Sequence, residues 1–241
     1  MISRLGFVVK RRRRGIKRSV ELFKKPLAPD DLMKALHVKD IYEGFDYQAI
    51  GEDLRGWASA SEVFAKLIAA TEPELIIEVG TWKGASAITM GNLLKERGRG
   101  KILCVDTWLG ALEMWNDHAD PDRYQSLKCR HGYPQVYYTF LANVCYAGLQ
   151  DVVIPFPLHS SSAALWLMMN GVVADMVYLD ASHEEDDVYQ DVLDYYHLLR
   201  PGGVLLGDDW NWSGVRSAVT RFASENRLEV EPCGEKWILK K

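Results

Sequence analysis

The chain has 241 residues, of which 48% are hydrophobic and 26% are charged, a balance typical of a globular protein with a large core. No apolar run reaches the length of a membrane span, and the four cysteines form no CxxC pair. This pattern argues against a disulfide framework or a zinc cage, and fits the reducing cytoplasm. The net charge of −4 hides an asymmetry, because residues 1–25 hold ten basic side chains and one acidic one.

Residues 1–25 therefore form a basic N-terminal arm of charge +9 in front of an acidic body of charge −13, residues 26–241. Ile16, Val20 and Phe23 fall at helical spacing within the arm. Two interpretations stay open: an unstructured tail, or a basic amphipathic helix that contacts an anionic membrane surface or glycan. Nucleic acid is not an expected partner, because the body is acidic and no aromatic residues interleave with the basic ones.

The sequence of residues 26–241 predicts one α/β domain that begins with a helical cap at residues 26–74. Strands and helices alternate from residue 75 onward, except at residues 107–133. That segment is rich in Trp, Asp, His and Gly, and we expect an inserted lid there. The expected helices are 61–70, 85–97, 135–147, 160–170, 184–199 and 215–225, and the expected strands are Leu75–Val79, 101–105, 152–156, 175–179, 204–207, 228–231 and 237–240.

Five alternations predict a Rossmann-like, doubly wound sheet that is mostly parallel. Ligands of such sheets bind beyond the carboxyl ends of the strands. Acids end four of the first five expected strands, so the fold gathers them on one rim: Glu78, Asp106, Asp180 and the pair Asp208–Asp209.

The turn Gly80–Gly84 follows the first of these strands. A dinucleotide fold would place three glycines there, in the pattern G-x-G-x-x-G, whereas this turn has two at G-x-x-x-G spacing. Glu78, two residues before the turn, would repel a pyrophosphate but could hold a ligand's hydroxyl or amine. S-adenosylmethionine carries an ammonium and a sulfonium and no phosphate, so it suits this rim. Asp106 is then placed to bind two ribose hydroxyls.

Four motifs in chain order carry a resemblance to a known family: E-V-G-T-W-K-G-A-S, V-D-T-W-L-G, Y-L-D-A-S-H and R-P-G-G-V-L-L-G-D-D-W. Together they resemble the class I S-adenosylmethionine-dependent methyltransferases, and within them the group of macrocin O-methyltransferase and cephalosporin hydroxylase-type proteins. The resemblance covers residues 75–212. It implies a sheet that ends in an antiparallel strand pair, and a homo-oligomer in which N-terminal helices pack between subunits.

The resemblance also implies a metal site and a cofactor site. In the family, the acids after the fourth and fifth strands hold a divalent metal, commonly Mg²⁺. The matching metal positions are Asp180, Asp208 and Asp209. The cofactor positions implied are Glu78, Gly80, Thr81, Trp82, Gly84, Ser86, Asp106, Thr107, Trp108, Ser160 and Asp180.

His183 is the candidate general base, with Asp180 as the second catalytic residue. The family often has D-G-D-H where this chain has D-A-S-H, so the middle acid is replaced by Ser182. Ser182 and Glu185 have capping-box spacing, which predicts that His183 lies in the first turn of the following helix. The positive helix end would then favour the neutral form of His183, which is the form that accepts a proton.

These patterns predict an O-methyltransferase that acts on a hydroxyl of a sugar or glycosylated small molecule with help from a divalent metal. Two alternatives stay open. One is a cofactor-binding partner subunit of the same fold without transfer activity. The other is a scaffold that its basic arm docks to a membrane or polysaccharide. The expected location is the cytoplasm, where the arm could attach the protein peripherally to the membrane.

Overall fold

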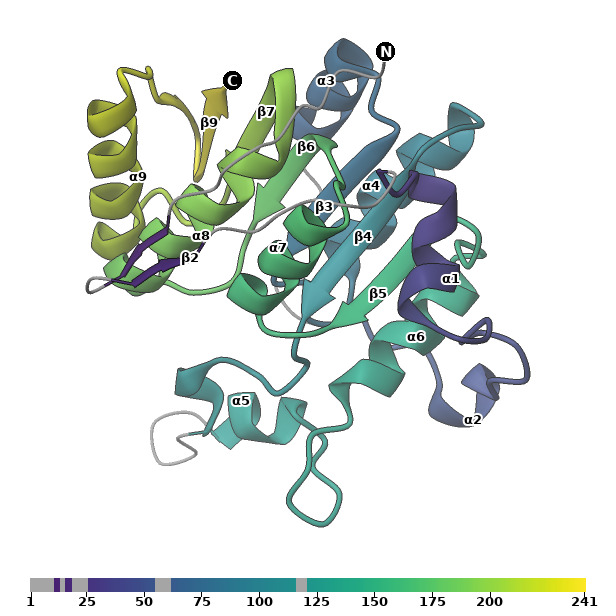
Figure 1. The fold of residues 1–241 in the computed structure, drawn as a ribbon. Helices are drawn as coiled ribbons and strands as arrows, with labels where there is room; N and C mark the ends of the chain where they lie inside the picture. Colours follow the sequence, from purple (N-terminus) through teal and green to yellow (C-terminus); the bar gives the residue numbers. More distant parts are fainter. Residues whose placement is uncertain (1–10, 14–15, 19–25, 55–61, 116–120) are drawn as a thin grey trace.

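The structure is a computed structural model, and it describes residues 11–13, 16–18, 26–54, 62–115 and 121–241 (Figure 1). Within the basic arm, β1 (Arg11–Arg13) and β2 (Ile16–Arg18) pair in antiparallel fashion. A helix that includes Ile16 is therefore wrong, and Val20 and Phe23 lie outside the described residues. Contact of the arm with a membrane or glycan stays a prediction. Among the described residues, no helix has both the length and the apolar character that crossing a membrane requires.

One seven-stranded sheet forms the centre of the molecule, in the order β5-β4-β3-β6-β7-β9-β8 (Figure 1). The strands from β3 to β7 are parallel, whereas β9 runs antiparallel to β7 and β8 antiparallel to β9. This confirms the Rossmann-like fold with an antiparallel C-terminal pair. The strand bounds are β3 Leu75–Val79, β4 Lys101–Asp106, β5 Val153–Pro157, β6 Ala174–Leu179, β7 Leu199–Gly207, β8 Glu231–Cys233 and β9 Lys236–Lys240.

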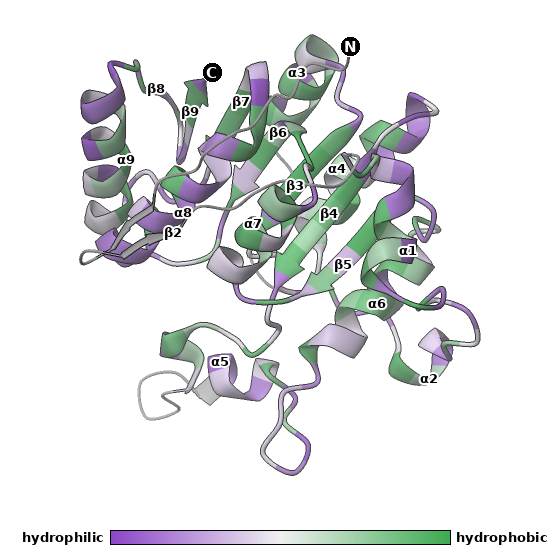
Figure 2. Ribbon diagram, in the orientation of Figure 1, coloured by the Kyte–Doolittle hydropathy of each residue, from purple (hydrophilic) through white to green (hydrophobic). Residues whose placement is uncertain are grey.

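Helices cover both faces of the sheet and bury a separate apolar core on each. One face packs against α7 (Ser160–Met169), α8 (Glu185–Leu198) and α9 (Ser213–Asn226). The other packs against α3 (Glu62–Thr71), α4 (Ala85–Glu96) and α6 (Val136–Tyr146). Figure 2 shows the apolar strands between these layers. All five residues of β3 are buried, as expected for a parallel strand covered on both faces.

Smaller elements lie outside these layers. The N-terminal cap contains η1 (Pro29–Asp31), α1 (Leu32–Leu36) and α2 (Tyr47–Ile50). The predicted lid contains η2 (Leu112–Trp115) and α5 (Pro121–Ser126), and lies beyond the carboxyl ends of the strands (Figure 1).

The main error in the predicted bounds is at the last strand pair. The expected strand at 228–231 is instead β8, three residues further on. Cys233 pairs with Lys236, so Gly234 and Glu235 form a two-residue hairpin loop, with Gly234 at a φ of 66°. A tight loop of this kind fixes the register of both strands, and it decides where β8 begins.

Candidate functional site

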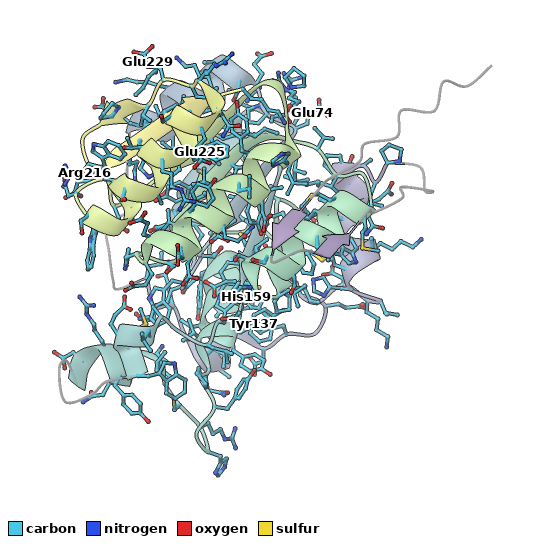
Figure 3. The ribbon with its side chains drawn as sticks, turned by 60° about the vertical axis from the view of Figure 1, so that its left-hand side comes forward. Glu74, Tyr137, His159, Arg216, Glu225 and Glu229 are labelled. Atoms are coloured by element: carbon cyan, nitrogen blue, oxygen red, sulfur yellow. The ribbon has the colours of Figure 1, made fainter. Side chains whose placement is uncertain are left out.

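The topological switch point of the sheet lies between β3 and β6. From β3 the chain moves outward to β4 and β5, and then returns to β6 on the other side of β3. Ligand sites of open α/β sheets lie at such points, beyond the carboxyl ends of the strands. In Figure 3, Tyr137 and His159 lie toward this end of the sheet, whereas Glu74 and Glu229 lie at the opposite end.

The turn after β3 is held by backbone hydrogen bonds to neighbouring strand ends. The Gly80 N–H donates to the carbonyl oxygen of Val105 at 2.9 Å. The Asp106 carboxylate accepts from the N–H groups of Thr81 and Trp82, both at 2.8 Å, and from Trp108 N–H at 2.7 Å. Asp106 therefore organises the turn. A carboxylate has about four acceptor positions, so one is left for a ligand hydroxyl.

Both glycines of the turn are required by close packing. A Cβ at Gly80 would lie 2.0 Å from the backbone oxygen of Asp180, and the φ of Gly80 is 83°. A Cβ at Gly84 would lie 2.8 Å from the Phe140 ring, and the φ of Gly84 is 90°. Any other residue would be strained at these φ values. Gly80 thus brings the ends of β3 and β6 together, and Gly84 lets α4 start against α6.

Glu78 does not face the rim, which corrects the sequence interpretation. Its side chain is 0% exposed and points to the α4 face of the sheet. There it accepts hydrogen bonds from Ser86 Oγ and, at 3.6 Å, from Cys104 Sγ. Burial raises the pKa of Glu78 to about 7, although the Ser86 hydrogen bond lowers it in part. Glu78 and Ser86 therefore support the turn from beneath.

The residues after Asp106 divide between the core and the surface. Trp108 is 2% exposed, donates from Nε1 to the Trp82 carbonyl at 2.7 Å, and packs against Phe140 with ring centroids 4.9 Å apart. It is a core residue, and its predicted cofactor contact stays a prediction. Trp82 is only partly buried, and so is Thr107, whose hydroxyl accepts from Leu109 N–H at 3.3 Å.

Ser160 opens α7, just after β5. Its carbonyl accepts a hydrogen bond from the Tyr195 hydroxyl at 2.9 Å, which ties α7 to α8. No described contact joins Ser160 to the turn, so its cofactor role stays a prediction.

A buried ion pair links the turn to the cap and the lid. Lys83 Nζ lies 3.2 Å from Asp53 Oδ2, and both side chains are 7% exposed. Lys128, from the lid, lies 2.8 Å from the same oxygen. Asn143 of α6 accepts from Asp53 N–H at 2.9 Å, and donates to the Asp53 carbonyl at 2.9 Å and to the Lys83 carbonyl at 2.8 Å. Asp53 thus joins three separate segments at the turn Gly80–Gly84.

The predicted metal acids lie together, but they already have partners. The Tyr178 hydroxyl lies 3.1 Å from Asp180 Oδ2 and 2.7 Å from Asp208 Oδ2. Asp208 Oδ2 also accepts from Lys236 Nζ, and Asp208 Oδ1 accepts from Asp209 N–H at 3.0 Å. Burial, together with the charges of the Asp208 and Asp209 carboxylates, raises the pKa of Asp180 to about 7.

These contacts do not fit a resident divalent cation. In the described part of the chain, no three His, Cys, Asp or Glu side chains are arranged to hold a metal. Mg²⁺ prefers open carboxylate oxygens and keeps several waters. Asp208 already contacts the Tyr178 hydroxyl, the Asp209 N–H and the Lys236 ammonium, so one of its about four acceptor positions is left. The contacts of the described rim residues therefore do not fit the predicted Mg²⁺ site, and no chemical step is assigned to a metal.

His183 lies on the same rim, with acids on two sides. Its Nε2 is 2.9 Å from Asp209 Oδ2, and its Nδ1 is 3.7 Å from Glu113 Oε1 of η2. The ring stacks on Trp212, with centroids 4.4 Å apart and planes 17° apart. The hydrogen bond to Asp209 raises the pKa of His183, and burial partly opposes this.

The capping prediction around His183 is wrong. Glu184 is the N-cap of α8, so His183 precedes the helix. The Ser182 hydroxyl accepts from Glu184 N–H at 3.2 Å instead of capping the first turn. The helix end thus does not decide the protonation of His183. The neighbouring carboxylates favour its charged form, opposite to the expected direction.

Several residues of the site were not predicted: Tyr178, Lys236, Glu113, Trp212 and the Asp53–Lys83–Lys128 cluster. One signal was available for Tyr178, because it lies two residues before Asp180, which follows β6, and period-2 alternation directs both side chains to the same side. The others join residues far apart in the sequence, and single-sequence patterns do not show such pairs.

Comparison with known protein families shows the family to which this chain belongs. The sequence profile described as "Methyltransferase domain" matches residues 77–210, from β3 through the acid pair after β7. The chain belongs to this methyltransferase family. The match spans more than half of the chain and contains the turn, Asp106, Asp180, His183 and Asp208. No curated protein sequence matches the chain.

Solved structures support the methyltransferase fold at low sequence identity. The O-methyltransferase NovP is 16% identical over 75% of this chain and 78% of its own, with a TM-score of 0.57. An O-methyltransferase from Bacillus cereus in complex with SAH is 17% identical over 88% and 96%, with a TM-score of 0.53. The calicheamicin methyltransferase CalS11 is 16% identical over 91% and 88%, with a TM-score of 0.54.

Proposed function

We propose that this methyltransferase transfers the methyl group of S-adenosylmethionine to a hydroxyl of a sugar or glycosylated small molecule, with His183 as general base. The observation that carries this proposal is the pair of His183 and Asp209, 2.9 Å apart on the rim at the carboxyl ends of the strands. In a methyltransferase, an imidazole fixed by a carboxylate is the group expected to take the acceptor's proton.

The cofactor assignment draws on the turn and on the structural relatives. The Bacillus cereus enzyme is in complex with SAH, and the O-methyltransferase TomG is in complex with SAM. In this chain the backbone from Gly80 to Gly84 and the remaining acceptor position of Asp106 form the side of the site that would hold the nucleoside. The half-buried Trp82 offers it a ring face.

The acceptor assignment draws on one relative and on the surface around His183. CalS11 is a TDP-rhamnose 3'-O-methyltransferase. Trp212, which stacks on His183, is 52% exposed, and Trp115, in the same short helix as Glu113, is 45% exposed. Exposed indole rings with a polar edge suit an acceptor that has both apolar and hydroxyl-bearing faces.

The proposed step is an in-line displacement. The acceptor oxygen forms a bond to the methyl carbon, the bond from sulfur to that carbon breaks, and S-adenosylhomocysteine leaves as a neutral thioether. His183 takes the hydroxyl proton. Because Nε2–H donates to Asp209, Nδ1 carries the free lone pair and is the accepting atom. Alignment of the two reacting atoms supplies much of the acceleration.

The test combines cofactor binding with transfer. We expect S-adenosylmethionine to bind in isothermal titration, and labelled methyl to reach a member of a panel of nucleotide sugars and glycosides. His183→Asn should lower kcat by at least about 100-fold while it changes the cofactor Kd by less than about twofold. His197→Asn, on the exposed side of α8, is the matched control and should retain full activity. Cofactor binding without transfer to any acceptor would instead favour the partner-subunit alternative.

The pH dependence tests the role of Asp209. Only neutral His183 accepts a proton, so the transfer rate should rise with pH through the raised pKa of His183. Asp209→Asn replaces the carboxylate that raises this pKa with a neutral amide, and the acid limb of the pH–rate profile should move to lower pH. An unchanged limb would mean that His183 is not the titrating base.

A further inference from the structure

Lys236 is a nearly buried cation among the acids of the rim. It is 8% exposed and lies on β9, where Trp237 pairs with Gly207 of β7. That antiparallel register brings Lys236 beside Asp208, the residue that follows Gly207. The same register places Lys236 on the face of the sheet that Ile238 shares, opposite to Trp237.

The ammonium of Lys236 has a specific set of contacts. Nζ donates to Asp208 Oδ2 and, at 3.1 Å, to the Tyr178 hydroxyl. It lies 5.3 Å from the centroid of the Phe64 ring and 5.0 Å from that of Tyr178, within the range of cation–π attraction. Carboxylate, hydroxyl and two aromatic rings thus surround one positive charge. The acids of this rim already have a cation supplied by the chain itself.

A buried charge of this kind persists only when it is paired, because desolvation of a lysine costs several kcal/mol. Asp208 supplies that pairing for Lys236, and His183 stands in the same relation to Asp209. The third acid, Asp180, reaches Lys236 through the Tyr178 hydroxyl. Asp208 and Asp209 thus each have a basic partner within the protein, and Asp180 has the Tyr178 hydroxyl.

We propose that Lys236 takes the place of a divalent cation at Asp208, so that the rim binds no Mg²⁺ or Mn²⁺ and methyl transfer needs none. A metal at Asp208 Oδ2 would have to displace the ammonium, and a dication beside that ammonium would be repelled by it. Lys236 is then a positioning residue, which fixes the Tyr178 hydroxyl and the Asp208 carboxylate. Only the catalytic consequence rests on the proposed function, because cation binding is measured without an acceptor.

The experiment is a titration with Mn²⁺, in which electron paramagnetic resonance reports the free ion. The wild-type protein should bind no stoichiometric Mn²⁺ up to about 1 mM. Lys236→Met, which keeps the length of the side chain and removes its charge, should bind one Mn²⁺ at least about tenfold more tightly than the wild type. Lys236→Arg keeps the charge and should behave like the wild type. Mn²⁺ should also raise the Tm of Lys236→Met and leave that of the wild type unchanged.

Two results would overturn the proposal. One is a wild-type Mn²⁺ site that Asp208→Asn abolishes, and the other is a folded Lys236→Met that gains no Mn²⁺. If Lys236→Met does not fold, Lys236→Gln is titrated in its place, and the wild-type titration is decisive by itself. Isothermal titration with S-adenosylmethionine reports on the proposed function separately, so a failure of either proposal is recognised on its own.

Discussion

The substitution Glu78→Gln tests the buried carboxyl beneath the cofactor turn through the pH dependence of stability. Burial raises the pKa of Glu78 from 4.5 to about 7 in the folded protein. Between these pH values the unfolded chain releases the proton of Glu78, whereas the folded chain keeps it. Ionisation therefore favours unfolding, and the free energy of unfolding falls as the pH rises through this window. Below and above the window the contribution of Glu78 is constant.

The expected magnitude follows from the two pKa values. The rise from 4.5 to about 7 corresponds to about 3 kcal/mol, at about 1.4 kcal/mol for each pH unit. Glutamine keeps the size of the side chain and still accepts from Ser86, but it does not ionise. Between about pH 4 and about pH 8, Glu78→Gln should therefore gain about 3 kcal/mol of stability relative to the wild type.

Urea unfolding followed by circular dichroism at a series of pH values measures this difference. The matched control is Glu96→Gln, because Glu96 is an exposed residue at the end of α4. The control should differ from the wild type by a constant amount across the same range. The reasoning from burial would be refuted if the difference in unfolding free energy between Glu78→Gln and the wild type changed by less than about 0.5 kcal/mol over this pH range.

Two further substitutions, each paired with a control, test the packing of the turn and the ion pairs at Asp53. Gly80→Ala places a Cβ 2.0 Å from a backbone oxygen at a φ of 83°, so we expect a loss of more than about 3 kcal/mol or failure to fold. Gly98→Ala is the control: Gly98 has a φ of 70°, but no atom lies within 4 Å of an added Cβ, so the substitution should cost about 1 kcal/mol. Equal losses of stability for the two glycine substitutions in urea unfolding would contradict the packing argument. Asp53→Asn removes a carboxylate shared by Lys83 and Lys128 and should cost about 3 kcal/mol. Lys128→Met is the control, and should cost less than about 1 kcal/mol because the Lys128 side chain is 37% exposed. A larger loss of stability in Lys128→Met than in Asp53→Asn, measured by thermal unfolding, would refute the linking role of Asp53.

The local sequence pattern of apolar runs, glycines and acids was sufficient to predict most of the fold. The apolar run at Leu75–Val79 is β3 with the predicted bounds, and alternation of strands and helices gave the mostly parallel sheet. The acids that end the strands meet at one edge because parallel strands share their carboxyl ends. The motif order also indicated the methyltransferase family, which the profile match over residues 77–210 shows.

Local pattern did not determine how those acids are used. Glu78 and Asp106 both end strands, yet Glu78 points into the core and Asp106 binds the turn. Asp208 meets Lys236, 28 residues away, only because β9 returns antiparallel to β7 in one register. His183 faces Glu113 only because the lid folds over the rim.

The sequence by itself therefore determined the class of fold, the family and the edge of the sheet at which the predicted site residues meet. Those features depend on burial and backbone conformation, which each short segment reports through its own periodicity and glycines. The tertiary structure alone decided which groups contact each acid, the orientation of His183, and the position of the Lys236 ammonium among the acids of the rim. Those features depend on contacts between distant residues, and strand order and register fix such contacts.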